Sequence, residues 1–137
     1  MYDTILVCLA LDHGLSARAL AAARALRSDT GRILAIHVHE MASGSVRTYL
    51  DDDVVEEAYA KAGTRLKERV GDNPDVEPVL LKGHSGRTIT DYADRIGADC
   101  IIVGSHKPGL RDFFLGSTAA RVVRHAPCAV HVLRDAA

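Results

Sequence analysis

The residue types that suggest chemistry are concentrated in one segment, residues 104–118, which reads GSHKPGLRDFFLGST. Three glycines in this segment, Gly104, Gly109 and Gly116, place no Cβ in the way of a ligand and tolerate a positive φ. Backbone amides in such a loop can therefore come close to a bound group. Because amide N–H groups are hydrogen-bond donors, the group that suits them is an anion.

The segment ends where a helical pattern begins, at Ser117 and Thr118. A helix N-terminus presents unpaired N–H groups and the positive end of the helix dipole, and both favour a phosphate. Lys107 and Arg111 add two cations, and the two hydroxyl groups add further donors. The residue types of this segment therefore predict a site for a polyphosphate chain.

The segment matches neither of the common phosphate-binding motifs. It lacks the Gly-Lys-Ser/Thr ending of a P-loop and the GxGxxG spacing of a dinucleotide-binding turn, and it follows the fourth predicted strand, not the first. An alternative interpretation is a turn whose glycines serve geometry alone, followed by a capped helix. Glycine spacing leaves both interpretations open.

The elements that position this segment alternate along the chain between short apolar runs and helical periods. Strands are predicted at residues 4–11, 32–39, 76–81, 99–104 and 128–133, and helices at residues 15–28, 55–70, 85–97 and 117–125. Such alternation, with right-handed crossovers, predicts one parallel sheet between two layers of helices. In an open sheet of this kind a ligand binds beyond the carboxyl ends of the strands, where the strand order reverses. A reversal between the first and fourth strands brings residues 8–14 next to residues 103–118.

Residues at the ends of the predicted helices follow capping preferences. Ser85 is expected to cap the third helix, and Gly97 to end it. Residues 28–31, SDTG, are expected to end the first helix, and the three aspartates at 51–53 give the second an acidic start. These signals set the expected boundaries of the elements.

Length and charge restrict the class of protein. The 137 residues predict one domain, residues 1–137. Seventeen basic against 18 acidic residues give a net charge of -1, which provides no field to attract nucleic acid or an anionic membrane. The longest apolar run, residues 5–11, is short of the roughly 20 residues that span a bilayer. Since the N-terminus also lacks the cationic start of a signal peptide, we expect a cytoplasmic protein with neither nucleic-acid nor membrane partners.

Cysteine and histidine spacing gives no convincing metal site. Cys8, Cys100 and Cys128 show no CxxC spacing and lie in or beside apolar runs, so we expect reduced core residues. His37 and His39 point to the same side of a strand and could begin a metal site, but no third ligand has suitable spacing. A structural role is therefore favoured for both, and no tightly bound metal is expected.

The chain resembles the universal stress protein family over essentially its whole length. The matching segments are ILV at 5–7, HVHE at 37–40, GADCIIVGSH at 97–106, LGST at 115–118 and RVVRHAPC at 121–128, with Gly83 after the third strand. The loop resembles the shorter SHRP-type loop of one branch of that family. The resemblance implies a five-stranded parallel sheet of order 3-2-1-4-5 and ATP, with or without Mg²⁺, as the ligand of the members that bind a nucleotide.

Carried over position by position, the resemblance places the base and ribose beside the first, second and fourth strands and the phosphates on the loop. The residues expected to bind nucleotide are Cys8, Leu9, Ala10, Val38, Val103, Gly104, Ser105, His106, Lys107, Gly109, Gly116, Ser117 and Thr118. No catalytic residue is implied.

Two positions depart from the family pattern. The second glycine of the loop pattern falls on Lys107, and the interval from there to Gly116 is one residue short. The aspartate of the first strand falls on Ala10, while Asp12 lies two residues later. A lost charged hydrogen bond costs about 1.5–3 kcal/mol, or about a tenfold to hundredfold loss of affinity. We therefore expect weak ATP binding or a retuned site.

The resemblance implies a protein that binds ATP or a related adenine nucleotide as a signalling ligand, with little or no turnover. Slow hydrolysis or self-phosphorylation on Ser105, Ser117 or Thr118 is the most that analogy allows. Two alternatives remain open, a nucleotide-free interaction module and an ATP-consuming enzyme. The resemblance also implies a homodimer formed through the last strand, residues 129–133. A phosphoacceptor receiver is disfavoured because Ala10 and Gly83 stand where it needs carboxylates.

Overall fold

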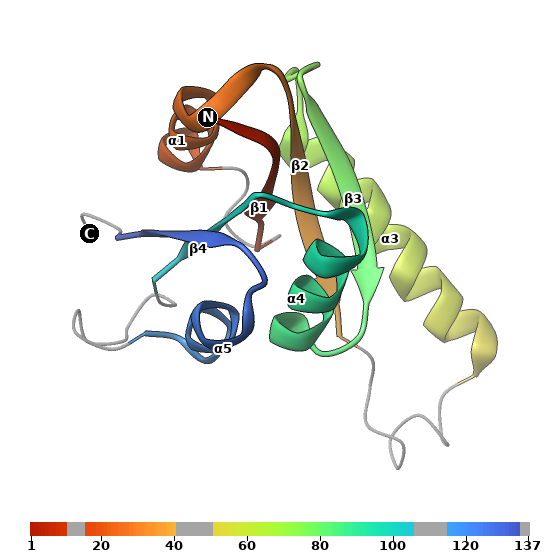
Figure 1. The fold of residues 1–137 in the computed structure, drawn as a ribbon. Coiled ribbons are helices and arrows are strands. Elements are labelled where there is room, and N and C mark those ends of the chain that lie inside the picture. The colour runs from red at the N-terminus through yellow and green to blue at the C-terminus, as the bar shows by residue number, and fades with distance from the viewer. Residues whose placement is uncertain (11–15, 41–50, 106–114, 135–137) are drawn as a thin grey trace.

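The protein is an open parallel sheet flanked by helices, described here from a computed structural model for residues 1–10, 16–40, 51–105 and 115–134 (Figure 1). In chain order the elements are β1 (Tyr2–Cys8), α1 (Ala17–Leu26), β2 (Arg27–His39), α3 (Asp52–Val70), β3 (Val76–Lys82), α4 (Ser85–Ile96), β4 (Cys100–Gly104), α5 (Ser117–His125) and β5 (Ala129–Leu133). The sheet order is β3-β2-β1-β4-β5 and every pairing is parallel, which confirms the predicted topology.

Two apolar clusters, one on each face of the sheet, hold these layers together. Alternate residues of β1 divide between them, so that Ile5 and Val7 join the cluster under α1 and α3 while Leu6 joins the cluster under α4 and α5. Figure 1 shows the same arrangement, with helices on both sides of the sheet. The central strands are covered on both faces, which explains their nearly continuous apolar sequences.

The boundary between α1 and β2 differs from the prediction. The helix ends at Leu26 and β2 begins directly at Arg27, whereas residues 28–31 were expected to form the helix end. Arg27 pairs with Tyr2 of β1 and donates to the carboxylate of Asp75 at 3.2 Å, and the register then shifts before Thr4. These long-range contacts draw the segment into the sheet, so the local turn signal of the SDTG sequence was misleading.

The helix ends follow local rules more closely. The hydroxyl of Ser16 accepts the N–H of Ala19 at 3.3 Å and so caps α1. Gly97 ends α4 in the left-handed conformation with φ of 69°, as predicted. The acidic start of α3 is also confirmed, although the helix begins at Asp52, three residues earlier than expected.

The cysteines are free thiols, in agreement with their expected role as core residues. Cys100 is buried, and Cys8 and Cys128 are partly buried. Within the described ranges, no helix has the length and apolar character needed to cross a membrane.

Candidate functional site

The strand order reverses between β1 and β4, as the sequence predicted. From β1 the chain adds β2 and β3 on one side, while β4 pairs with the other side of β1 and is followed outward by β5. Pairing of Val7 with Ile102 brings the carboxyl ends of β1 and β4 side by side. Open parallel sheets bind ligands at such a reversal.

A small hollow lies at this reversal. Its volume is about 90 Å³, and it is lined by Val7, Cys8, Leu9, Ser16, Ala19, Ile102, Val103, Gly104 and Leu133. Four residues expected to contact nucleotide, Cys8, Leu9, Val103 and Gly104, therefore lie together around one cavity. Drug-sized ligands occupy pockets of about 300–1,000 Å³, so this hollow suits one part of a nucleotide.

Gly104, the last residue of β4, leaves open space beside this hollow. It is exposed, and among the described residues a Cβ built on its backbone would meet no other atom within 4 Å. Its φ is also outside the left-handed region, in contrast to Gly71, Gly83 and Gly97. The chain itself therefore does not require glycine here, whereas a ligand that approaches the backbone would.

Ser105 and Gly116 tie the two ends of the loop together. The N–H of Gly116 donates to the carbonyl of Ser105 at 2.7 Å, and the N–H of Ser105 donates to the carbonyl of Leu133 at 3.0 Å. Ser105 is also 2% exposed. The amide of Ser105 therefore joins the end of β4 to β5, and the amide of Gly116 joins it to the start of α5, so neither of these two amides is left to bind a ligand.

The donors that remain lie in the first turn of α5. The N–H of Ala120 donates to the carbonyl of Gly116 at 2.9 Å and is the first intrahelical bond. The N–H groups of Ser117, Thr118 and Ala119 consequently have no helical acceptor. Gly116 supplies no side-chain cap, and the first turn has no acidic residue. This uncapped helix start can receive an anion through three backbone donors and the exposed hydroxyl of Ser117.

Thr118 contacts Ser85, and Ser85 in turn contacts Glu40; the sequence had not assigned Ser85 or Glu40 to the site. Its hydroxyl Oγ1 lies 2.9 Å from Oγ of Ser85, and the N–H of Ser85 donates to Oε1 of Glu40 at 3.3 Å. His84, not Ser85, is the N-cap of α4, and Ser85 is the first helical residue. Glu40 follows the carboxyl end of β2, and Ser85 lies just beyond the carboxyl end of β3. This position was the one feature of the sequence that could have placed them near the site.

The end of β1 is fixed against β2, and the expected residues Ala10 and Val38 do not line the hollow. The N–H of Leu9 donates to the carbonyl of Ile36 at 2.8 Å, and Nδ1 of His37 lies 3.0 Å from the carbonyl of Leu9. Val38 is buried and Ala10 is exposed. His37 therefore holds the end of β1, which is the structural role expected for it.

The second histidine of β2 also has a packing role. His39 contacts the ring of Tyr59 edge to face, with 5.7 Å between ring centroids. In the described part of the chain, no three His, Cys, Asp or Glu side chains group as metal ligands would.

Cys8 contributes a neutral wall to the hollow at the end of β1. Burial raises the pKa of its thiol to about 12. At neutral pH the sulfur is therefore protonated, and it is poorly suited to act as a nucleophile.

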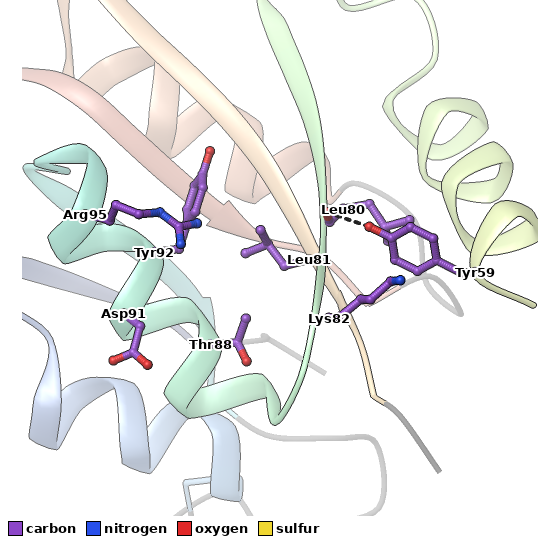
Figure 2. A pocket seen from close by; sticks show the side chains of 8 residues that line it. All are labelled: Tyr59, Leu80, Leu81, Lys82, Thr88, Asp91, Tyr92 and Arg95. Atoms are coloured by element: carbon purple, nitrogen blue, oxygen red, sulfur yellow. Dashed lines mark hydrogen bonds between the residues drawn. The ribbon is translucent and has the colours of Figure 1, made fainter. Parts of the chain in front are cut away.

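A second hollow, of about 420 Å³, lies at the edge strand β3, two strands away from β1 (Figure 2). Its lining residues are Tyr59, Leu80, Leu81, Lys82, Thr88, Asp91, Tyr92 and Arg95. The hydroxyl of Tyr59 donates to the carbonyl of Leu80 at 3.3 Å, and Nζ of Lys82 lies 4.1 Å from the centroid of the Tyr59 ring. The Tyr59 hydroxyl thus supplies a partner for one carbonyl of the edge strand. The expected nucleotide residues are not part of this hollow.

Several predicted site residues cannot be placed. His106, Lys107 and Gly109 lie outside the described residues, as do Arg111 and Asp12. The contacts expected of them stay predictions.

Comparison with known proteins gives a consistent family assignment. Residues 1–134 match the family model described as "Universal stress protein family". Universal stress protein G of Salmonella typhimurium is 32% identical over 143 residues, which cover 98% of this chain and 100% of the relative. A universal stress protein of Thermus aquaticus is 31% identical over 142 residues, with the same coverage of 98% and 100%.

Solved structures share the fold over their full length. The protein MJ0577 superimposes with a TM-score of 0.71 at 27% identity, covering 100% of this chain and 99% of that one. The universal stress protein UspA of Lactobacillus plantarum gives a TM-score of 0.66 at 26% identity, with coverage of 97% and 98%.

More distant structures of the same fold contain adenine nucleotides. A family protein of Arabidopsis thaliana has AMP bound, with 19% identity, a TM-score of 0.62 and coverage of 98% and 93%. A universal stress protein of Archaeoglobus fulgidus is in complex with dAMP, with 22% identity, a TM-score of 0.52 and coverage of 96% and 97%. A third is in complex with cAMP, with 20% identity, a TM-score of 0.57 and coverage of 96% and 97%. At these identities the likeness establishes a common fold.

Proposed function

This chain belongs to the universal stress protein family, and from that premise we propose that it binds ATP or a related adenine nucleotide as a regulatory ligand. The proposed site lies at the carboxyl ends of β1 and β4. The nucleotides present in the three distant structures support the choice of an adenine nucleotide as the ligand class.

The phosphate end of the proposed site is the first turn of α5. The observation that carries the proposal is that no described side chain caps this helix start, and that the N–H groups of Ser117, Thr118 and Ala119 have no helical acceptors. Phosphate oxygens accept from such amides and interact favourably with the positive end of the helix dipole. The hydroxyls of Ser117 and Thr118 supply further donors.

The base and ribose end is the hollow between β1 and β4. Cys8, Leu9 and Val103 give it apolar walls, and Gly104 keeps its rim open. Val38 is the further apolar residue expected beside the base. Such walls favour the flat faces of an aromatic base, because their burial removes nonpolar surface from water.

Ala10 reduces the affinity that we expect. It occupies the position of the family aspartate and brings no hydrogen-bonding side chain. Binding should therefore be weaker by about tenfold to hundredfold than in a member that has the carboxylate.

The chemistry of the described site favours binding over turnover. The carboxylate of Glu40 accepts the N–H of Ser85, and the thiol of Cys8 is held protonated by its high pKa. The Cys8 thiol is therefore not a general base at neutral pH, and one oxygen of the Glu40 carboxylate already serves the start of α4. We therefore propose that occupancy, not hydrolysis, is the signal, and that any self-phosphorylation or hydrolysis is slow.

A calorimetric titration tests the proposal. ATP, ADP, AMP and adenosine are titrated in turn into the protein, with GTP as the control for the base. Saturable heat with the adenine series supports the proposal. Absence of heat and of any thermal shift at millimolar adenine nucleotide would overturn it and favour the nucleotide-free interaction module.

The edge strand β5 supports a second proposal, a homodimer formed by antiparallel pairing of two β5 strands. Among the described strands β5 pairs only with β4, and Val130 and Val132 on it are partly buried. A partner strand would satisfy its free backbone groups and cover this apolar surface. Light scattering at micromolar concentration should give the mass of a dimer, and a monomer mass would contradict the proposal.

We propose the cytoplasm as the compartment in which the protein acts. Cys8, Cys100 and Cys128 are all free, which suits a reducing environment. Fractionation of cells that express the untagged protein tests this location. Recovery in a secreted or membrane fraction would contradict it.

A further inference from the structure

A hydroxyl pair connects the starts of two helices beside the proposed phosphate position. Ser85 is the first residue of α4 and Thr118 is the second residue of α5, and their hydroxyl oxygens are 2.9 Å apart. The two helices are in close contact here. A Cβ built on Gly86 would lie 2.7 Å from Cδ and 2.9 Å from Cβ of Arg121.

Ser85 is itself held in place by the ends of two strands. Its N–H donates to Oε1 of Glu40, which follows β2, at 3.3 Å. Gly83, two residues before it, directly follows β3 and has a φ of 136° that few other residues adopt. Around Gly83 a side chain would also collide with Oγ1 of Thr88. The backbone at Ser85 therefore has little freedom, and its hydroxyl is a fixed point for Thr118.

We infer that Ser85 is a positioning residue that orients the Thr118 hydroxyl toward the nucleotide phosphate. The inference rests on the proposed function, because it assigns a role within that site. When Ser85 donates its proton to Oγ1 of Thr118, the proton of Thr118 is left to donate to a phosphate oxygen. A hydroxyl that accepts one hydrogen bond is polarised and becomes a better donor in the next.

This chain of hydroxyls makes a selective contribution. It contacts the phosphate but not the base or ribose, so its loss should weaken binding of AMP and leave binding of adenosine unchanged. A hydroxyl that serves only to join α4 to α5 would instead change the stability of the fold and affect both ligands equally.

The test compares AMP and adenosine by calorimetric titration of the full chain. The variants are Ser85→Ala, Thr118→Val, the double variant, and Ser85→Thr, which restores a hydroxyl. Thr64→Ala is the matched control, because its hydroxyl bonds the carbonyl of Ala60 within α3, away from the site. Thermal melting without ligand confirms that each variant is folded.

Removal of one hydrogen bond should weaken AMP binding by about two- to tenfold in Ser85→Ala and leave adenosine binding unchanged. The double variant should bind AMP no more weakly than Thr118→Val, because both changes break the same chain. Ser85→Thr should recover the wild-type affinity.

Unchanged AMP binding in Ser85→Ala would overturn the inference while the proposed function stands. An equal loss for AMP and adenosine would also overturn it, since that result indicates a structural role. If the wild-type protein binds neither ligand, the proposed function fails and this inference fails with it.

Discussion

Substitution of Gly104 tests whether this glycine is needed for ligand binding or for the fold. Within the part of the chain that the structure describes, a Cβ at this position meets no atom within 4 Å, and the residue does not have a left-handed φ. Gly104→Ala should therefore leave the folded state unstrained. Because alanine has less freedom than glycine in the unfolded chain, we expect a gain of about 0.4–1 kcal/mol in the free energy of unfolding.

The same substitution should harm nucleotide binding. The added methyl group lies at the open rim of the hollow between β1 and β4, where the proposed ligand approaches the backbone. Displacing a ligand from a close backbone contact costs at least one hydrogen bond, so we expect an affinity loss of about two- to tenfold. Gly104→Val, which adds two more carbons, should lose more.

Gly31 is the matched control. A Cβ there would lie 2.6 Å from Cγ of Arg27 and 2.8 Å from the carbonyl oxygen of Tyr2. Gly31→Ala should therefore lower the free energy of unfolding by about 1–3 kcal/mol through overpacking, with nucleotide affinity unchanged in the folded protein.

Thermal denaturation followed by circular dichroism and calorimetric titration with AMP measure the two effects. A gain of about 1 kcal/mol corresponds to a melting temperature higher by roughly 2–5 °C for a chain of this size. If Gly104→Ala destabilises the protein and leaves AMP affinity unchanged, the glycine serves the fold and the reasoning about the site is refuted.

Three further predictions concern stability and reactivity. The Arg24 guanidinium beside Asp75 holds the pKa of that carboxyl at about 2, below its usual value of about 3.9, so its contribution is present above pH 4 and is lost as pH falls toward 2. Acid titration of Asp75→Asn by circular dichroism should show a weaker loss of stability over that interval, and an unchanged profile would contradict the pairing. Cys8, with its pKa raised to about 12, should react with a thiol reagent at pH 8 much more slowly in the folded than in the urea-unfolded protein, and equal rates would show that it is not shielded. Leu66→Ala, on the buried face of α3 at a residue that is 2% exposed, should lower the free energy of unfolding in urea by about 2–5 kcal/mol, and a loss below about 1 kcal/mol would contradict tight packing there.

The sequence was sufficient to predict the fold because its signals were local and repeated. Apolar strands alternated with amphipathic helices, and the resemblance supplied the strand order that periodicity alone leaves open. Gly97 is an example of a local signal. A glycine after an amphipathic helix predicts that the helix ends in the left-handed conformation, and Gly97 has a φ of 69°. The start of β2 was missed because Arg27 is drawn into the sheet by Tyr2 and Asp75, which are distant in sequence.

The site was predicted in outline, and its contacts were not. The sequence indicated that α5 would begin near the end of β1, but it did not indicate that the N–H of Gly116 would donate to the carbonyl of Ser105. The bond between Ser85 and Thr118 joins residues 33 positions apart and depends on how α4 packs on α5. Such contacts are fixed by tertiary packing, for which the local sequence carries no signal.

The most direct test of the proposed site is an amide NMR titration of the wild-type protein with AMP. If AMP binds at the start of α5, the amide resonances of Ser117, Thr118 and Ala119 should shift saturably, and those of Gly31 and Gly97 should not shift. Binding that saturates without shifting the first turn of α5, or no binding at millimolar AMP, would contradict the proposed site.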